Sequence, residues 1–426
     1  MVSSLSAKDV FNAQGVIIDV RSESEFREAS IPGAVSLPLL NDAERAEVGT
    51  LYKQRSPEIA RARGKEIVTP KLADFFRNFA VLSGMHDLRE PLLETLAAAF
   101  ETVTKELWED LGSPEALGSP KGLSPSTILV VPLSPSVSNS DLDFRSPSYS
   151  DSSFRPDEQL LTPQPDARMQ LIFYCWRGGA RSKSLARFGE ILGFRTAYVQ
   201  GGHKLFRAHV QSFLESAPYP FKLCTLYGLT GAGKTKIIRQ WLKEKRAVLD
   251  LEALAHHRGS AFGQVGIDQT GRQKDFENNL FWQMKLLAKR GEKTVVVEGE
   301  SRRIGRCQLP IAFMEAMKTG FKVKVECPIE RRVQNILDDY VHPLGLDEAR
   351  LHREAQGSLD AIKKRLGGEA HQEMSALLAE KNYSAFTREL LVQYYDKMYS
   401  LSQAADDHYD AVISDAADFE VLLQMF

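Results

Sequence analysis

Cysteine is scarce in this chain. Four cysteines occur among 426 residues, and they stand far apart, at positions 175, 224, 307 and 327. No C-x-x-C pair is present, so the sequence favours neither a zinc knuckle nor a disulfide framework. Such sparse cysteine is typical of a protein from a reducing compartment.

Long apolar runs and a strong net charge are also missing. No run reaches the ~18 apolar residues of a membrane-spanning helix, and the opening MVSSLSAKDVF lacks the apolar core of a signal peptide. The formal charge of −2 gives no general attraction to nucleic acid, so RNA binding must come from local patches. We expect a cytoplasmic protein without a membrane partner; an organellar location and the oligomeric state stay open.

One stretch differs from the rest in composition. Residues 113–165 hold nine of the nineteen prolines and five Ser-Pro pairs. Such a segment cannot bury enough apolar surface to offset its ordering entropy, so we predict a disordered insertion. Together with helical patterns just before it, the insertion is expected to occupy about 70–167. It is either a site of regulatory phosphorylation or a tolerated loop expansion.

Apolar strands alternate with amphipathic helices on both sides of this insertion. Strands are expected at Gly15–Arg21, Leu171–Cys175 and 196–202, which predicts an α/β domain with a parallel sheet over 1–218. The alternation restarts with strands at 223–228, 247–252, 294–299 and 322–327. This predicts a second, doubly wound α/β domain over 219–426, extended by helices from about Leu346 onward.

The stretch YCWRGGARS (174–182) places a thiol before glycines and arginines, between a strand and a helix. Two successive glycines let backbone N–H groups turn inward as an anion-binding nest, and the helix N-terminus adds positive potential. In such a place the pKa of a thiol falls from ~8.5 to roughly 4–7. The alternative is a buried cysteine with only a structural role. The candidate catalytic residues are Cys175, Arg177, Gly178, Gly179, Arg181 and Ser182.

Two chemistries use such a loop. The spacing C-x5-R-[ST] is that of cysteine-dependent phosphatases, whereas a rhodanese cysteine carries sulfur or selenium. The upstream segment IIDVRSESEFREASIPGAVSLPL, with Asp19 and Arg21 at its strand end, favours a rhodanese-like fold. A phosphatase would also need a general acid, for which Asp19 and Glu23 are the candidates.

The octapeptide GLTGAGKT (228–235) fits the phosphate-binding pattern G-x-x-x-x-G-K-[ST] and lies between an apolar strand and a helix, as that pattern requires. This pattern predicts that the backbone of the loop surrounds a diphosphate and that the lysine reaches its terminal phosphate. The threonine hydroxyl would ligate Mg²⁺. The expected diphosphate-binding residues are Gly228, Gly231, Gly233, Lys234 and Thr235.

Further candidates follow this P-loop in the sequence. Glu298 ends a predicted strand, where P-loop folds place a metal-linked acid, and Glu300 is the neighbouring candidate. The segment HHRGSAFG (256–263) indicates an anion-binding loop or, alternatively, a capping turn; its histidines lack a third ligand for a metal. The basic clusters KEKR (243–246), SRRIGR (301–306), ERR (330–332) and KKR (363–365) are RNA-backbone candidates or solvated faces.

Taken together, these stretches resemble bacterial-type tRNA 2-selenouridine synthase. The similarity includes VRSESEFREASIPGAVSLPLLNDAERAEVGTLYK, YCWRGGARS, VQGGHKLFR, GLTGAGKT, LDLEALAHHRGSAFG, FENNLF, VEGESRRIG and YYDKMY, in the family's order. It covers nearly all of the chain outside the insertion. A rhodanese-like cysteine loop and a P-loop in one chain are a specific combination.

The resemblance implies a reaction on tRNA. The 2-thiouridine at the wobble position becomes 2-selenouridine: geranyl diphosphate first alkylates the sulfur, and selenophosphate then supplies selenium while the geranyl thiol leaves. The resemblance assigns Cys175 to selenium transfer and the P-loop to the prenyl diphosphate. The other matched residues are His257, Arg258, Gly259 and Ser260 of an HRGS loop and Glu300, Ser301 and Arg302 of an ESR motif.

The sequence departs from the family pattern in two places. Gly299 stands where many members have an acidic residue, which weakens the assignment of a metal site there. The Ser/Pro-rich insertion suggests a eukaryotic source. Two other hypotheses remain: a rhodanese sulfurtransferase fused to an ATP-dependent small-molecule kinase, and a non-catalytic phosphopeptide-binding module.

Overall fold

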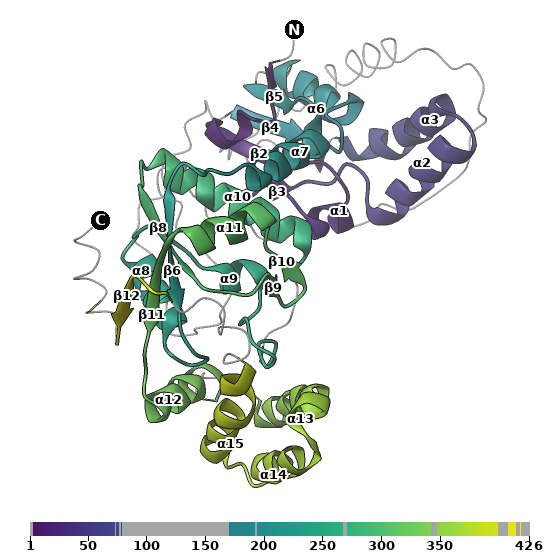
Figure 1. Cartoon of the computed structure of the whole chain (residues 1–426). Coiled ribbons are helices and arrows are strands. Elements are labelled where there is room, and N and C mark those ends of the chain that lie inside the picture. The colour runs from purple at the N-terminus through teal and green to yellow at the C-terminus, as the bar shows by residue number, and fades with distance from the viewer. Residues whose placement is uncertain are drawn as a thin grey trace, which may run out of the picture. The chain divides into compact units, whose positions relative to one another are not determined.

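A computed structural model describes residues 3–72, 74–75, 78, 170–191, 194–266, 271–341, 347–398, 408–414 and 418 (Figure 1). The chain separates into two compact units, Met1–His209 and Val210–Phe426, which we describe one at a time. The predicted disordered insertion, and most of the helical region expected before it, lie outside the described residues. The domain boundary expected at residue 218 stays a prediction.

The first unit is built on a parallel sheet in the order β1-β5-β4-β2-β3. Its central pair joins two segments that are remote in sequence, since Gly15 of β2 lies opposite Gln170 of β4 and Asp19 lies opposite Tyr174. The expected α/β fold on both sides of the insertion is therefore confirmed. The strands are β1 (Ser4–Leu5), β2 (Gly15–Asp19), β3 (Val35–Ser36), β4 (Gln170–Tyr174) and β5 (Thr196–Val199).

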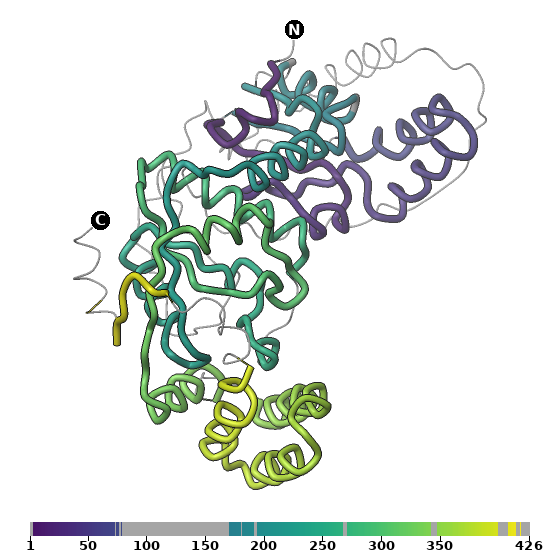
Figure 2. The backbone as a smooth tube through the Cα atoms, in the orientation of Figure 1, coloured from purple at the N-terminus to yellow at the C-terminus, as the bar shows by residue number. Residues whose placement is uncertain are grey.

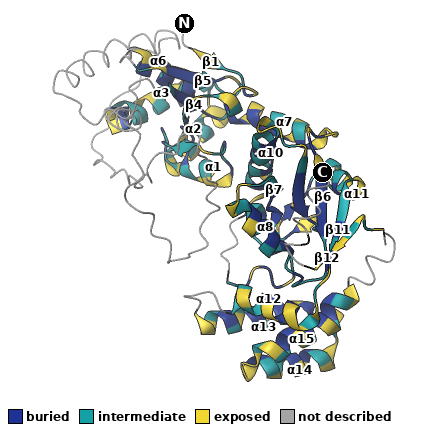
Figure 3. Cartoon of the chain, turned by 90° about the vertical axis from the view of Figure 1, so that its left-hand side faces the viewer, coloured by how far each residue is buried: buried dark blue, intermediate teal, exposed yellow. Residues whose placement is uncertain are grey.

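Helices cover this sheet and bury its apolar side chains. Ile18, Leu171 and Phe173 are fully buried, as expected for strands enclosed on both faces (Figure 3). A separate helical pair, α2 and α3, is fixed by N-cap side chains, with Asn41 accepting from Glu44 N–H and Ser56 from Ile59 N–H. The helices are α1 (Glu23–Glu28), α2 (Asp42–Gln54), α3 (Pro57–Val68), α6 (Ala180–Ile191) and the beginning of α7 (Gly202–Glu215), which continues into the second unit.

The second unit contains another parallel sheet, in the order β12-β11-β6-β8-β7. The central strand β6 leads directly into the P-loop, so that loop lies at the carboxyl edge of the sheet, where α/β proteins bind ligands. The strands are β6 (Lys222–Tyr227), β7 (Val248–Leu249), β8 (Thr294–Glu298), β11 (Phe321–Val325) and β12 (Ala411–Ile413), with an antiparallel hairpin of β9 (Arg303–Ile304) and β10 (Cys307–Gln308).

Helices of the second unit form two groups. Those between the strands are α8 (Lys234–Lys243), α9 (Leu251–Ala255), α10 (Gln273–Lys289) and α11 (Ile311–Thr319). The second group lies together in Figures 1 and 2 and shares one apolar core. It contains α12 (Ile329–Tyr340), α13 (Glu348–Leu366), α14 (Gly368–Ala379), α15 (Tyr383–Leu390) and a π-helical turn (Leu391–Tyr395). This agrees with the expected helical extension.

No helix in the described part of the chain has the length and apolarity needed to cross a membrane.

Candidate active sites in the cysteine loop and the P-loop

Cys175 directly follows β4 and is 3% exposed. The turn after it depends on close backbone packing. Gly178 has a φ of +61°, and a Cβ there would collide with the carbonyl of Val199; Gly202, with a φ of +56°, leaves no room for a Cβ beside the carbonyl of Cys175. That carbonyl accepts a hydrogen bond of 2.9 Å from the N–H of His203. The cysteine loop is therefore held from the start of α7 as well as from β4.

The two neighbouring glycines of the loop are not equivalent. Gly178 adopts the left-handed conformation that a nest requires. Gly179 is not among the described glycines with a positive φ, and a Cβ there would meet nothing within 4 Å. A nest pairs a left-handed residue with a right-handed one, so a single positive φ fits the expected anion-binding turn, which stays a prediction.

Burial would raise the pKa of the Cys175 thiol, but the Arg181 charge and hydrogen bonds from Ser182 and the backbone of Arg177 lower it below its ordinary value. The sulfur lies 3.3 Å from the Ser182 hydroxyl oxygen. Arg181 and Ser182 lie in the first turn of α6, where the helix terminus also favours a negative charge. The loop thus stabilises a thiolate, the reactive form of cysteine.

The two loop arginines are placed differently. One guanidinium nitrogen of Arg181, Nη1, is buried and has no hydrogen-bond partner among the described residues. A buried donor without an acceptor is costly, so this nitrogen suits an anionic ligand. Arg177 has an exposed side chain. Arg181 therefore has the better position for an anion next to the thiol.

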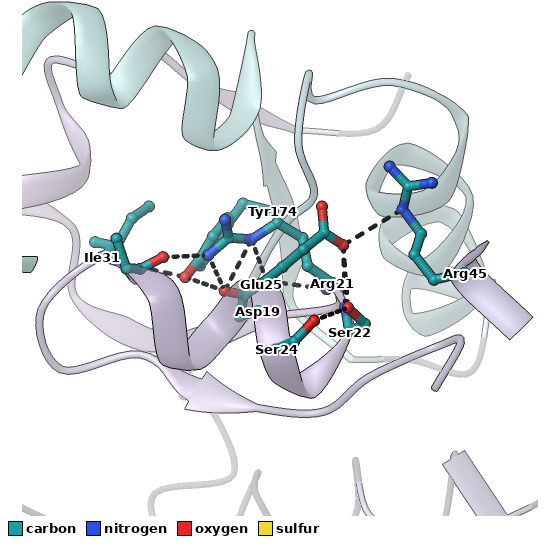
Figure 4. A network of polar contacts seen from close by, with 9 residues as sticks. Asp19, Arg21, Ser22, Ser24, Glu25, Ile31, Arg45 and Tyr174 are labelled. Carbon is teal, nitrogen blue, oxygen red and sulfur yellow. Dashed lines mark hydrogen bonds and ion pairs between the residues drawn. The ribbon is translucent and has the colours of Figure 1, made fainter. Parts of the chain in front are cut away.

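Asp19 and Arg21 form a buried network with Tyr174, the residue before Cys175 (Figure 4). The guanidinium of Arg21 donates to the carboxylate of Asp19 at 2.6 Å and to the carbonyl of Ala29 at 2.7 Å. The Tyr174 hydroxyl donates to the same carboxylate at 2.6 Å and accepts from the N–H of Ile31 at 3.1 Å. Asp19 and Arg21 are 0% and 1% exposed. The structure thus gives them a supporting position, and the Asp19 carboxylate is occupied by Arg21 and Tyr174.

In the P-loop, Gly228, Gly231 and Gly233 all have a positive φ, which turns backbone N–H groups toward a common centre. The side chain of Lys234 is buried, and its Nζ donates to the carbonyl of Gly228 at 2.7 Å. The helix α8 begins at Lys234. This arrangement combines a helix N-terminus, a nest and a cation, the features of a phosphate cradle.

Carboxylates gather beside Thr235. Its hydroxyl oxygen lies 3.2 Å from Glu252 Oε2 and 3.5 Å from Glu298 Oε2, and Glu298 is fully buried. Burial, followed by the charges of Glu300 and Asp250, raises the pKa of Glu252 to about 8. Burial and the neighbouring acids, Glu252 first, likewise raise the pKa of Glu298 well above its usual value. A cation would relieve this crowding of buried carboxylates.

These oxygens fit Mg²⁺, which prefers hard oxygen ligands and usually takes only one or two carboxylates together with substrate phosphates. Among the described residues, no group of three or more side chains is arranged as a complete metal site. A magnesium ion would therefore depend on the oxygens of a bound diphosphate. Sequence reasoning missed Asp250 and Glu252; the end of the expected strand at 247–252 was the available signal.

The HRGS loop lies against the same carboxylates. A Cβ at Gly259 would lie 2.6 Å from Glu252 Oε1 and 2.8 Å from Glu300 Oε2. Arg258 donates to the carbonyl of Val265 at 2.7 Å, and its guanidinium carbon lies 4.4 Å from the ring centroid of Tyr340. The structure therefore brings this loop, Lys234, Thr235 and the acidic cluster together.

The remaining predicted residues, from the HRGS loop, the ESR motif and the ERR cluster, differ in their burial. Nδ1 of His257 is buried without a partner among the described residues, and burial and the Arg258 charge lower the pKa of His257. Arg302 and Ser301 are exposed next to the β9–β10 hairpin. Of the ERR cluster, Arg332 is 3% exposed and pairs with Asp396 at 2.6 Å, so it is not free to bind an RNA backbone.

Comparisons with known proteins identify relatives of this chain. A family model described as tRNA 2-selenouridine synthase AAA domain matches residues 221–423. A curated tRNA 2-selenouridine synthase from Bordetella petrii is 32% identical, over 92% of this chain and 88% of the relative. One from Pseudomonas syringae pv. syringae is 31% identical, over 94% of this chain and 91% of the relative.

A crystal structure of the N-terminal domain of a Clostridium difficile 630 protein, described as ATP/GTP binding, covers 49% of this chain and 98% of its own. Its TM-score is 0.26 at 22% identity, so it carries no argument here. The curated relatives show the family of this chain, because their similarity spans both units. One unit contains the cysteine loop and the other contains the P-loop. The chain belongs to the tRNA 2-selenouridine synthase family.

Proposed function

We propose that this protein is a transferase that modifies tRNA and converts the wobble 2-thiouridine to 2-selenouridine through an S-geranylated intermediate. Geranyl diphosphate and selenophosphate are its co-substrates. The observation that carries this proposal is the presence, in one chain of this family, of a thiolate-stabilising loop and a diphosphate-type loop, each with its own cationic side chain.

In the first step, the sulfur of 2-thiouridine attacks the geranyl carbon that is bonded to the diphosphate oxygen. The carbon–oxygen bond breaks, and diphosphate leaves with the bonding electrons. The buried Lys234 and the backbone N–H groups of the P-loop support this step, since they would stabilise the charge that develops on the leaving group. Mg²⁺ held through Thr235 and the adjacent carboxylates would neutralise further charge there.

In the second step, the selenium of selenophosphate attacks the C2 carbon of the base, the carbon–sulfur bond breaks, and the geranyl thiol leaves with the bonding electrons. Water then attacks phosphorus, the phosphorus–selenium bond breaks, and phosphate is released while selenium stays on C2. Alkylation serves this step because a neutral thioether sulfur is displaced more readily than a thiocarbonyl sulfur. We assign the step to the cysteine loop. Support comes from the lowered pKa of Cys175 and from the buried nitrogen of Arg181, which suits the phosphate of the donor.

The test uses tRNA that contains 2-thiouridine, incubated with the full-length protein and each co-substrate in turn. Nucleosides from the digested RNA are then identified by mass spectrometry. We expect S-geranyl-2-thiouridine with geranyl diphosphate alone and 2-selenouridine when selenophosphate is added. ATP-dependent phosphorylation of a small molecule, with no change in the RNA, would instead support the fusion of a sulfurtransferase and a kinase.

A further inference from the structure

The second unit contains an apolar cavity of about 620 Å³, including its open mouth. Most of the residues that line it belong to α12, α13, α14, α15 and the π-helical turn, which lie together in Figure 1. The apolar lining includes Ile336 of α12, Leu351 and Ala355 of α13, Phe386 and Leu390 of α15, and Leu391 of the π-helical turn.

The cavity shares residues with the diphosphate site. Thr230 belongs to the P-loop and Ser260 to the HRGS loop, and both line the cavity. Tyr340, whose ring lies next to the guanidinium of Arg258, lines it as well. The two loops that surround the carboxylates and Lys234 therefore also contribute to the wall of the apolar space.

The helical group is attached to the P-loop by direct hydrogen bonds. Arg332 of α12 donates through Nε to the carbonyl of Thr230 at 2.9 Å, and Asn335 donates to the carbonyl of Gly231 at 2.8 Å. Arg332 also forms a bidentate ion pair with Asp396, with nitrogen–oxygen distances of 2.6 and 3.0 Å. These bonds fix the cavity wall relative to the loop, so a ligand that spans both would meet a preorganised site.

We propose that this cavity binds the hydrocarbon chain of the prenyl diphosphate while the P-loop binds its diphosphate. The chemistry of the lining favours this occupant, because a chain of carbon atoms gains free energy from burial among Leu, Ile and Phe side chains. Hydroxyl-bearing side chains such as those of Tyr383 and Tyr395 also line the cavity, but most of its surface is apolar, so a ribose would find fewer hydrogen-bond partners there than in water. The inference rests on the proposed function and extends it to the substrate's tail.

The test compares prenyl diphosphates of increasing length: dimethylallyl, geranyl and farnesyl. Ala355→Leu places a larger side chain in the cavity, so we expect kcat/KM for geranylation to fall about 10–200-fold while transfer from dimethylallyl diphosphate is less affected. Phe386→Leu enlarges the cavity and should raise the relative use of farnesyl diphosphate. Gly357→Leu is the matched control, since Gly357 is exposed on the same helix and has open space around it.

Binding of inorganic diphosphate should be equal in the wild type and in all three variants, which verifies that the P-loop is intact. If Ala355→Leu does not fold, Phe386→Leu alone decides, through the ratio of farnesyl to geranyl transfer. Unchanged chain-length preference in a folded variant overturns the cavity assignment and leaves the proposed function standing. If the wild type transfers none of the prenyl groups, the proposed function itself is wrong, and this inference with it.

Discussion

Tyr174 and Asp19 are joined by a hydrogen bond of 2.6 Å although 155 residues separate them in the sequence. They lie opposite each other on neighbouring strands. Tyr174, on β4, directly precedes Cys175, and Asp19, on β2, lies two residues before Arg21. The bond therefore connects the strand that carries the thiol to the buried Asp19–Arg21 pair. We therefore expect the geometry of the cysteine loop to depend on this connection.

Removing the Tyr174 hydroxyl should destabilise the protein. In Tyr174→Phe, the buried carboxylate loses a donor and the N–H of Ile31 loses its acceptor, for which we expect a cost of about 1.5–3 kcal/mol. Urea unfolding measures it. Tyr52→Phe is the control, because Tyr52 is 56% exposed and should change stability little. Equal stability of the two variants would contradict the importance of the network.

Cys175 should react as a thiolate at a lower pH than an ordinary thiol. The pKa of Cys175 is lowered. At a pH below the pKa of a free thiol, a larger fraction of Cys175 is therefore ionised, and its alkylation by iodoacetamide is faster. Burial raises the pKa of Cys224 to about 12 and that of Cys307 to about 11, so these should remain unreactive at neutral pH. Mass spectrometry of peptides gives the rate at each cysteine.

Arg181 should account for much of this reactivity. Arg181→Ala removes the charge that stabilises the thiolate, so the midpoint of the alkylation rate should move to higher pH. Arg177→Ala removes an exposed guanidinium and should move it less. A larger shift in Arg177→Ala than in Arg181→Ala would show that our placement of the two arginines is wrong.

Substitutions in the P-loop and in the cysteine loop should block different steps of the reaction. Lys234→Ala removes a cation from the diphosphate site, and we expect geranylation to slow about 100–1,000-fold, with selenation retained when geranylated tRNA is supplied. Cys175→Ser should still form geranylated tRNA and then stall before 2-selenouridine. One digest analysed for all three nucleosides measures both steps. Loss of geranylation in a folded Cys175→Ser protein would refute this division.

Deleting residues 113–165 should leave the fold and the basal activity nearly intact. The central β2–β4 pair of the first unit forms between segments on either side of this stretch, and the composition of the stretch predicts disorder. Thermal unfolding and geranylation assays provide the measurement. A drop in Tm of many degrees would mean that the segment contributes to the packed structure.

Local sequence patterns predicted the P-loop, the cysteine loop and the parallel strands, because each depends on neighbouring residues and their periodicity. The position of Asp19 was harder to predict: its partner Arg21 is close in sequence, but Tyr174 is remote. Glu252 was missed for a similar reason, since only the fold brings it to Thr235. The apolar cavity depends on side chains from several helices, and no single segment indicates it.

The β2–β4 ladder also has a consequence for synthesis on the ribosome. The strand at Gly15–Asp19 is synthesised about 155 residues before its partner at Gln170–Tyr174. At about 5–20 residues per second, its edge toward β4 stays unpaired for roughly 8–30 s. During that interval the nascent chain is a natural client for chaperones, and slower translation would lengthen its exposure.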